Sequence, residues 1–297
     1  RDRRRADPGP RRRGGAGARD RGGVAGPALA DPGGGLGDEE FINSHYVVFA
    51  TKNGTVKKTC LKEYSRPRAN GVKALIISDG DEVVDVRLTN GSNELIIADR
   101  NGRAVRFDEG QIRPSGRAAM GVRGMTLDGD DDAVVGMIVV NNPDKETAMV
   151  VSENGYGKRS EIGEYRKTSR AKKGVKTIAI TDKTGKLVAI KNVTDENDLM
   201  IINKSGIVIR MAVANVRVMG RATQGVRLIN LTKKNDTIAS VCKVMSSELE
   251  ATVEEESRQK WNETNEKLQQ DIVSQDAEPT TDDAPETPAS DDNDTTE

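Results

Sequence analysis

Basic residues recur at fixed places along the middle of this 297-residue chain. Three sets of four stand out, and within each set the members follow one another at intervals of about 50 residues, the period expected of a repeat architecture. The first set is Lys58, Arg106, Arg159 and Arg210; the second is Arg68, Arg117, Arg170 and Arg221; the third is Lys73, Arg123, Lys176 and Arg227. Only 46 of the 297 residues are Lys or Arg, so chance is a poor explanation. Cations held at regular intervals can bind a polyanion.

Duplex DNA is the polyanion that these cations fit best. Lys and Arg release counterions from the phosphate backbone, and such contacts position a duplex without reading its bases. Aromatic residues make up 3% of the chain, too few for a platform on which single-stranded bases stack. Neighbouring cations complete the predicted DNA-binding residues, namely Lys57, Lys158, Lys172 and Lys173. The alternative, solvated charges on exposed strand faces, predicts scatter in position and sign.

Other residues that could do chemistry form weaker patterns. Asp128, Asp130, Asp131 and Asp132 crowd one turn and could suggest a metal site or a hydrolase, but they lack a calcium-loop spacing, which favours an exposed loop. His45 is the single histidine, and Cys60 and Cys242 lie far apart without a metal-binding spacing. We therefore expect no catalytic residue and no metal site in this chain.

The basic sets are carried by a repeated β-unit. Each unit has a strand, a turn ending in glycine and a second strand, and Asn-Gly in such a turn favours a hairpin. The turn glycines are Gly54, Gly102, Gly155 and Gly206, at steps of 48, 53 and 51 residues. An Arg-Ala pair and a Gly-Val-basic segment follow in every unit. Expected strands include 46–50, 94–98, 133–140, 148–152, 186–190 and 199–202.

This period predicts an all-β, propeller-like array of four-stranded antiparallel blades. A radial arrangement would place equivalent cations on one convex edge that could bend duplex DNA, at a cost of about 1–6 kcal/mol. The expected organisation is a disordered Arg/Gly/Pro-rich segment at 1–40, a four-blade domain at 41–246 (blades about 41–92, 93–145, 146–196 and 197–246), a possible helix at 247–274 and an acidic disordered tail at 275–297.

Charge is divided unevenly among these regions. Residues 41–246 carry a formal net charge of +11 and residues 247–297 carry −14. The acidic end could compete with DNA for the basic region or serve only as a solubilising tail, and both interpretations stay open. The sequence has no apolar run of membrane-spanning length and no signal peptide, so we expect an intracellular, soluble protein without a membrane partner.

The repeats closely resemble the C-terminal β-pinwheel domain of the DNA gyrase A protein, from the bacterial type IIA topoisomerase. The resemblance covers about residues 41–246 and rests on 50–59 with 61–64, on 116–124 and on 134–137. It implies a pinwheel that wraps DNA and supports ATP-dependent negative supercoiling by the whole enzyme. It also implies a bacterial cytoplasmic, nucleoid-associated protein whose partners are the gyrase A breakage-reunion domain and the gyrase B protein. ATP and Mg would belong to that complex, with no cofactor in this chain.

The chain departs from that family in three ways. Four blades are found where about six are usual, and the breakage-reunion domain with its catalytic tyrosine is absent, since Tyr46, Tyr64, Tyr156 and Tyr165 all sit in repeat contexts. The segment 11–17 resembles the family's wrapping box only in part. Two alternative functions remain, the corresponding C-terminal domain of topoisomerase IV and a propeller-like scaffold that binds acidic proteins.

Overall fold

The hairpins expected at the glycine turns all form. The structure is a computed structural model that describes residues 38–231 and 236–246. The first unit contains β1 (Tyr46–Thr51), β2 (Thr55–Cys60), the 3₁₀ turn η1 (Leu61–Tyr64) and β3 (Val83–Thr89). The second contains β4 (Glu94–Asp99), β5 (Arg103–Asp108), η2 (Glu109–Gln111), β6 (Val122–Arg123) and β7 (Val134–Val140). The strands expected at 46–50, 94–98 and 133–140 are thus confirmed, to within a residue at their ends.

The second half of the chain repeats this plan. The third unit contains β8 (Thr147–Ser152), β9 (Tyr156–Glu161), η3 (Ile162–Glu164), β10 (Val175–Lys176) and β11 (Leu187–Val193). The fourth contains β12 (Asn197–Asn203), β13 (Val208–Ala212), η4 (Val213–Asn215), β14 (Val226–Arg227) and β15 (Ile238–Met245). The all-β prediction is therefore confirmed through the described part of the fourth unit.

One short helix, α1 (Glu39–Ser44), precedes the first strand and was not expected from the strand period. Asp38 caps it by accepting the backbone N–H groups of Glu40 and Phe41, and Ile42 is its buried residue. The helix lies across the boundary predicted at residue 40. The expected segment before residue 38, the possible helix at 247–274 and the tail at 275–297 lie outside the described residues.

Neighbouring units exchange strands. The described residues form four antiparallel sheets with the orders β3-β1-β2-β6, β7-β4-β5-β10, β11-β8-β9-β14 and β15-β12-β13. The two-residue strands β6, β10 and β14 each complete the sheet of the preceding unit. Each sheet boundary therefore runs through a sequence unit rather than between two units, which periodicity alone does not reveal.

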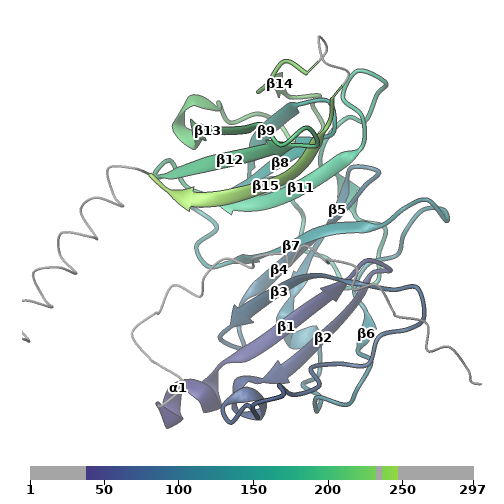
Figure 1. The fold of residues 1–297 in the computed structure, drawn as a ribbon, viewed down its shortest axis with the longest axis vertical. Coiled ribbons are helices and arrows are strands. Elements are labelled where there is room, and N and C mark those ends of the chain that lie inside the picture. Colours follow the sequence, from purple (N-terminus) through teal and green to yellow (C-terminus); the bar gives the residue numbers. More distant parts are fainter. Residues whose placement is uncertain (1–37, 232–235, 247–297) are drawn as a thin grey trace, which may run out of the picture.

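The strands β3, β7, β11 and β15 lie on the inner side of the array. β3 packs against β7, β7 against β11, and β11 against β15. In Figure 1 they follow one another from the lower to the upper half of the molecule. The exchanged strands β6, β10 and β14 occupy the opposite border of their sheets. Whatever these three strands carry is presented on the outside of the array.

Three apolar layers hold the four sheets together. Leu95 and Ile97 of β4 face the layer shared with the first sheet, whereas Ile96 and Ala98 face the layer shared with the third. Successive residues of a strand point to opposite faces, so a strand between two layers needs an uninterrupted apolar run. This is why thin layers of aliphatic residues suffice for the core. No helix among residues 38–231 and 236–246 is long and apolar enough to span a bilayer.

Candidate nucleic-acid interface

The third basic set lies on the outer edge of the array. Arg123, Lys176 and Arg227 end the exchanged strands β6, β10 and β14, and all three are exposed. A glycine precedes each of these strands and lets the backbone approach the neighbouring strand closely. Gly174, for example, has φ +75°, and a Cβ there would stand 2.2 Å from the carbonyl oxygen of Ala104 on β5. The remaining member, Lys73, is also exposed, but its segment forms no strand.

A fourth basic set, missed in the sequence, joins this edge. One exposed arginine stands two residues beyond the end of every 3₁₀ turn; these are Arg66, Arg113, Arg166 and Arg217. Their steps of 47, 53 and 51 residues nearly equal those of the turn glycines. The same periodicity test, extended to this position, would have found them. Two exposed cations per unit therefore recur, one on the Gly-Val-basic segment and one after the 3₁₀ turn.

Arg166 of the fourth set lies with two of the predicted DNA-binding lysines at a groove beside the second sheet. The groove has a volume of about 460 Å³ and is lined by Arg106, Arg166, Lys172 and Lys173 together with the backbone around Gly174. Lys173 and Lys172 are exposed, and Nζ of Lys173 lies 2.8 Å from Oδ1 of Asp128. That hydrogen bond and charge lower the pKa of Asp128. The groove can hold an anionic group such as a phosphate.

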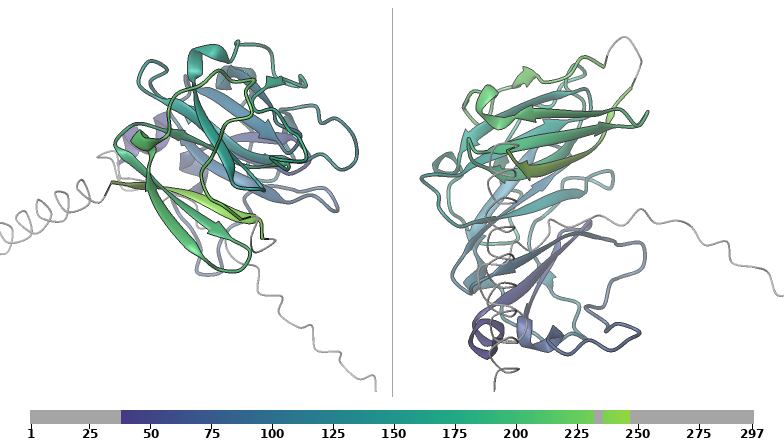
Figure 2. Two further views of the ribbon diagram at one scale, coloured as in Figure 1. Left: turned by 90° about the horizontal axis from the view of Figure 1, so that it is seen from above. Right: turned by 60° about the vertical axis from the view of Figure 1, so that its left-hand side comes forward.

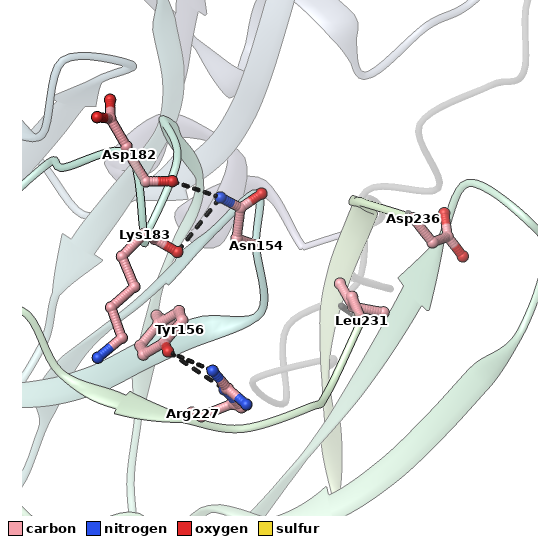
Figure 3. Close-up of a pocket in the computed structure, with 7 residues that line it drawn as sticks. All are labelled: Asn154, Tyr156, Asp182, Lys183, Arg227, Leu231 and Asp236. Atoms are coloured by element: carbon pink, nitrogen blue, oxygen red, sulfur yellow. Dashed lines mark hydrogen bonds between the residues drawn. The ribbon is translucent and has the colours of Figure 1, made fainter. Parts of the chain in front are cut away.

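A second hollow, of about 330 Å³, lies beside the exchanged strand β14. Figure 3 shows Arg227 pointing at Tyr156, to whose Oη its Nη2 donates a hydrogen bond at 2.9 Å. Nζ of Lys183 lies 5.6 Å from the centre of the same ring. The side-chain amide of Asn154 donates to the carbonyl oxygens of Asp182 and Lys183, which fixes the loop that carries this lysine. Two cations thus converge on one aromatic ring at the outer edge.

Four of the predicted contact residues lie inside the protein. Lys57, Lys58, Lys158 and Arg159 are exposed by 1%, 3%, 0% and 8%. Nζ of Lys57 donates to the carbonyl oxygens of Ala74 and Arg117. Burial lowers the pKa of Lys57 and lowers that of Lys158 to about 8. These side chains are beneath the surface and are not part of the exposed cationic edge.

The first basic set has a structural role in joining units. Arg106 donates to the Glu94 carboxylate at 2.6 Å and to the carbonyl oxygens of Ile162, which begins η3 in the next unit, and of Tyr165, which follows it. Burial opposes ionisation of Glu94, but hydrogen bonds from Lys167 and Arg106 outweigh it and lower its pKa. The regular recurrence of this set therefore has an explanation other than DNA.

The equivalents of Arg106 make similar contacts. Nζ of Lys58 donates hydrogen bonds to the carbonyl and carboxylate oxygens of Glu109 in η2. Nε of Arg159 donates to the carbonyl oxygen of Val216, which follows η4. Arg210 in the last unit pairs with Asp198 at 2.7 Å. The first set thus fixes each 3₁₀ turn to the preceding sheet wherever a following unit is described.

The second set holds the outer strands in place. Nη1 of Arg170 donates to the carbonyl oxygen of Arg123, and Nη1 of Arg221 donates to that of Lys176, both at 2.8 Å. Arg117 lies 3.8 Å from the Glu63 carboxylate. Arg117, Arg170 and Arg221 are half-buried and Arg68 is exposed. Members of this set position the third set and keep part of their charge at the surface.

The other candidate residues form no reactive centre in the described part of the chain. Asp132 is buried rather than exposed, and its two oxygens accept the N–H groups of Asp128 and Ala133. No group of three or more His, Cys, Asp and Glu side chains there could hold a metal ion. His45 stacks on Phe41 and is part of the α1 terminus. The box-like segment 11–17 lies outside the described residues.

Antiparallel sheets that exchange their outer strands around a common inner side define a β-pinwheel, here with a cationic outer edge. A sequence model described as the DNA gyrase C-terminal domain, beta-propeller, matches residues 45–90, 93–141, 146–194 and 197–242. The chain belongs to this family. The matched segments follow the four units expected from the sequence.

Relatives and solved structures agree with this assignment. The DNA gyrase A protein of Staphylococcus aureus (strain NCTC 8325 / PS 47) is 40% identical over 236 residues, covering 79% of this chain and 26% of the relative. A solved DNA gyrase A C-terminal domain aligns with a TM-score of 0.61 at 24% identity, covering 68% of this chain and 67% of that one. The C-terminal domain of a DNA topoisomerase IV aligns with a TM-score of 0.65 at 29% identity, covering 72% and 67%. The chain thus spans about a quarter of the length of its curated relatives.

Proposed function

We propose that this chain binds and bends duplex DNA along the outer edge of its β-pinwheel. The observation that carries the proposal is the recurrence of exposed cations on successive outer strands and after successive 3₁₀ turns. The proposed contact residues are Arg66, Arg68, Lys73, Arg113, Arg123, Arg166, Lys172, Lys173, Lys176, Arg217 and Arg227. Phosphate contacts spread over several units offset the cost of bending a duplex.

The proposed role of the longer protein follows from its relatives, which are DNA gyrase A proteins. In that setting the pinwheel presents bent DNA to the gyrase A breakage-reunion domain, and the gyrase B protein with ATP and Mg drives negative supercoiling. The complex would work in the bacterial cytoplasm, at the nucleoid. The likeness to a topoisomerase IV domain keeps that enzyme as a second candidate.

Removing edge cations tests DNA binding directly. We expect the triple variant R113A/K176A/R217A to weaken duplex affinity for all sequences and to reduce the slope of log affinity against log salt by about 0.9 per lost phosphate contact. The control, K62A/K145A/K204A, removes the same charge from exposed residues that belong neither to the third basic set nor to the fourth. Fluorescence anisotropy over a salt series measures both slopes. Equal slopes for the two triple variants would show that the outer edge is not the DNA-binding surface.

Bending is tested by a separate measurement. Nicked circular DNA closed by ligase in the presence of the chain should shift in linking number if the duplex is wrapped. A protein-interaction scaffold would leave the distribution unchanged, and the sign of the shift reports the hand of the wrap.

Deleting residues 247–297, which carry a net charge of −14, should raise DNA affinity if the tail competes and leave it unchanged if the tail only aids solubility.

A further inference from the structure

The hollow beside β14 combines an aromatic floor with two exposed cations. Tyr156 begins β9, is 7% exposed and lies opposite Arg227 in the pairing of β9 with β14. Lys183 belongs to the turn between β10 and β11, and both it and Arg227 are exposed. Cζ of Arg227 and Nζ of Lys183 stand 5.4 and 5.6 Å from the centre of the Tyr156 ring. The sheet that carries this ring packs between the second and the fourth sheets (Figures 1 and 2).

Neither cation is neutralised by a carboxylate. Within residues 38–231 and 236–246, no ion pair includes Arg227 or Lys183. Asp182 and Asp236 also line the hollow, but the Asp236 carboxylate accepts hydrogen bonds from a serine hydroxyl and a backbone N–H. The Asp182 carboxylate points away from the aromatic ring in Figure 3. Two positive charges that line one hollow favour the binding of an anion there.

Both cations are held in place by neighbouring side chains. Nε and Nη2 of Arg227 donate to Oη of Tyr156 at 3.2 and 2.9 Å, and a guanidinium has further N–H donors for a phosphate oxygen. The side-chain amide of Asn154 donates to the carbonyl oxygen of Lys183 at 3.3 Å and so fixes the turn that carries this lysine. Groups positioned in advance lose less conformational entropy when they bind a ligand.

The corresponding places in the earlier units lack this combination. The turn before the inner strand carries Lys183 in the third unit, but it carries Asp81 in the first and Asp128 in the second. In the first sheet, Thr55 takes the place of the tyrosine, and Asp81 lines the hollow beside it. In the second, Lys173 is paired with Asp128 at 2.8 Å. An anionic backbone therefore meets two unpaired cations beside β14 and a carboxylate at each of the two earlier places.

We propose that this hollow holds the phosphate backbone of bound duplex DNA, with Arg227 and Lys183 as contact residues and Tyr156 as the positioning residue for Arg227. The inference rests on the proposed DNA binding and adds Lys183 and Tyr156, which belong to none of the four basic sets. It makes the edge beside β14 a fixed point of the DNA path rather than one of several equivalent contacts. Phosphate contacts position a duplex and do not read its sequence.

Duplex binding by the full chain, followed by fluorescence anisotropy over a salt series, tests the proposal. K183A removes one phosphate contact and should reduce the slope of log affinity against log salt by about 0.9. Y156F keeps the ring and every charge but removes the acceptor of the Arg227 hydrogen bonds, so it should weaken affinity about 2- to 10-fold. The control K145A removes an exposed lysine from the turn between β7 and β8 and should bind like the wild type. Circular dichroism melting verifies that each variant is folded.

A double-mutant cycle separates positioning from a general structural effect of the tyrosine. In the R227A background, Y156F should leave affinity unchanged, because the guanidinium that the hydroxyl orients is gone. A loss of equal size in the wild-type and R227A backgrounds overturns the positioning role. A salt slope of K183A equal to that of K145A overturns the phosphate site.

Failure of this site is distinguishable from failure of DNA binding along the edge. If R113A/K176A/R217A weakens binding while K183A does not, the outer edge binds DNA and the hollow beside β14 does not. If neither the triple variant nor K183A changes the salt slope, the proposed DNA-binding surface and this site are both wrong.

Discussion

Asp99 should make the stability of the fold depend on pH. Its side chain is 0% exposed at the end of β4, and its Oδ1 accepts the N–H of Arg103 at 2.8 Å, while its Oδ2 has no hydrogen-bond partner among the described residues. Burial, opposed by that N–H and reinforced by the neighbouring Asp132 carboxyl, raises the pKa of Asp99 to about 7. The ionised carboxylate is therefore costly in the folded state.

The size of the effect follows from proton linkage. The pKa rises from 3.8 to about 7, and each unit is worth about 1.4 kcal/mol, so ionised Asp99 costs on the order of 4 kcal/mol. Because folding raises the pKa of Asp99, the protonated side chain favours the folded state. This contribution to the free energy of unfolding is fully present below about pH 4 and is lost as the pH rises through about 7. Asp99→Asn removes the titration. Asn203 occupies the equivalent place in the fourth unit and accepts the N–H of Ile207 in the same way, so the amide fits.

Urea denaturation of the wild type and D99N between about pH 4 and pH 8 measures the prediction. The free energy of unfolding of D99N minus that of the wild type should grow by on the order of 4 kcal/mol across that range, because all other groups titrate alike in both proteins. D131N, which alters an exposed carboxylate of the 128–132 turn, should leave the pH dependence as in the wild type. A difference between D99N and the wild type that is constant with pH would refute the reasoning.

Two further predictions concern the joints between units. Lys158→Met should abolish the rise in stability expected between about pH 8 and pH 10.5, where the buried lysine, with its pKa lowered to about 8, is neutral in the folded state but still charged in the unfolded state, and denaturation at alkaline pH checks this. Val105 and Ile209 fill the same place in other units, so an aliphatic side chain is compatible. Gly174→Ala should destabilise the fold by about 2–4 kcal/mol, because its Cβ would stand 2.2 Å from a carbonyl oxygen in addition to the strain of φ +75°. Gly80→Ala carries only the strain, about 1 kcal/mol, and equal melting temperatures for the two alanine variants would contradict the account.

Much of the fold could be predicted from the sequence because the sequence is periodic. Equivalent positions in successive units take equivalent places in space, so the steps between Gly54, Gly102, Gly155 and Gly206 predicted four hairpins and the strands around them. A period specifies which residues are alike, and this was sufficient for the fold class and the family.

Periodicity does not specify which of the like residues face outward. Lys58 and Lys73 were equally good candidates in the sequence, yet Lys58 is 3% exposed against Glu109 and Lys73 is exposed to solvent. The difference arises because the next unit covers the strand that carries Lys58, by pairing a strand of only two residues with it. No local sequence pattern predicts so short a strand. Sequence therefore determined the repeating unit and the charge it carries. Only the packing of one unit on another decided which charges join the units and which remain free to meet a partner.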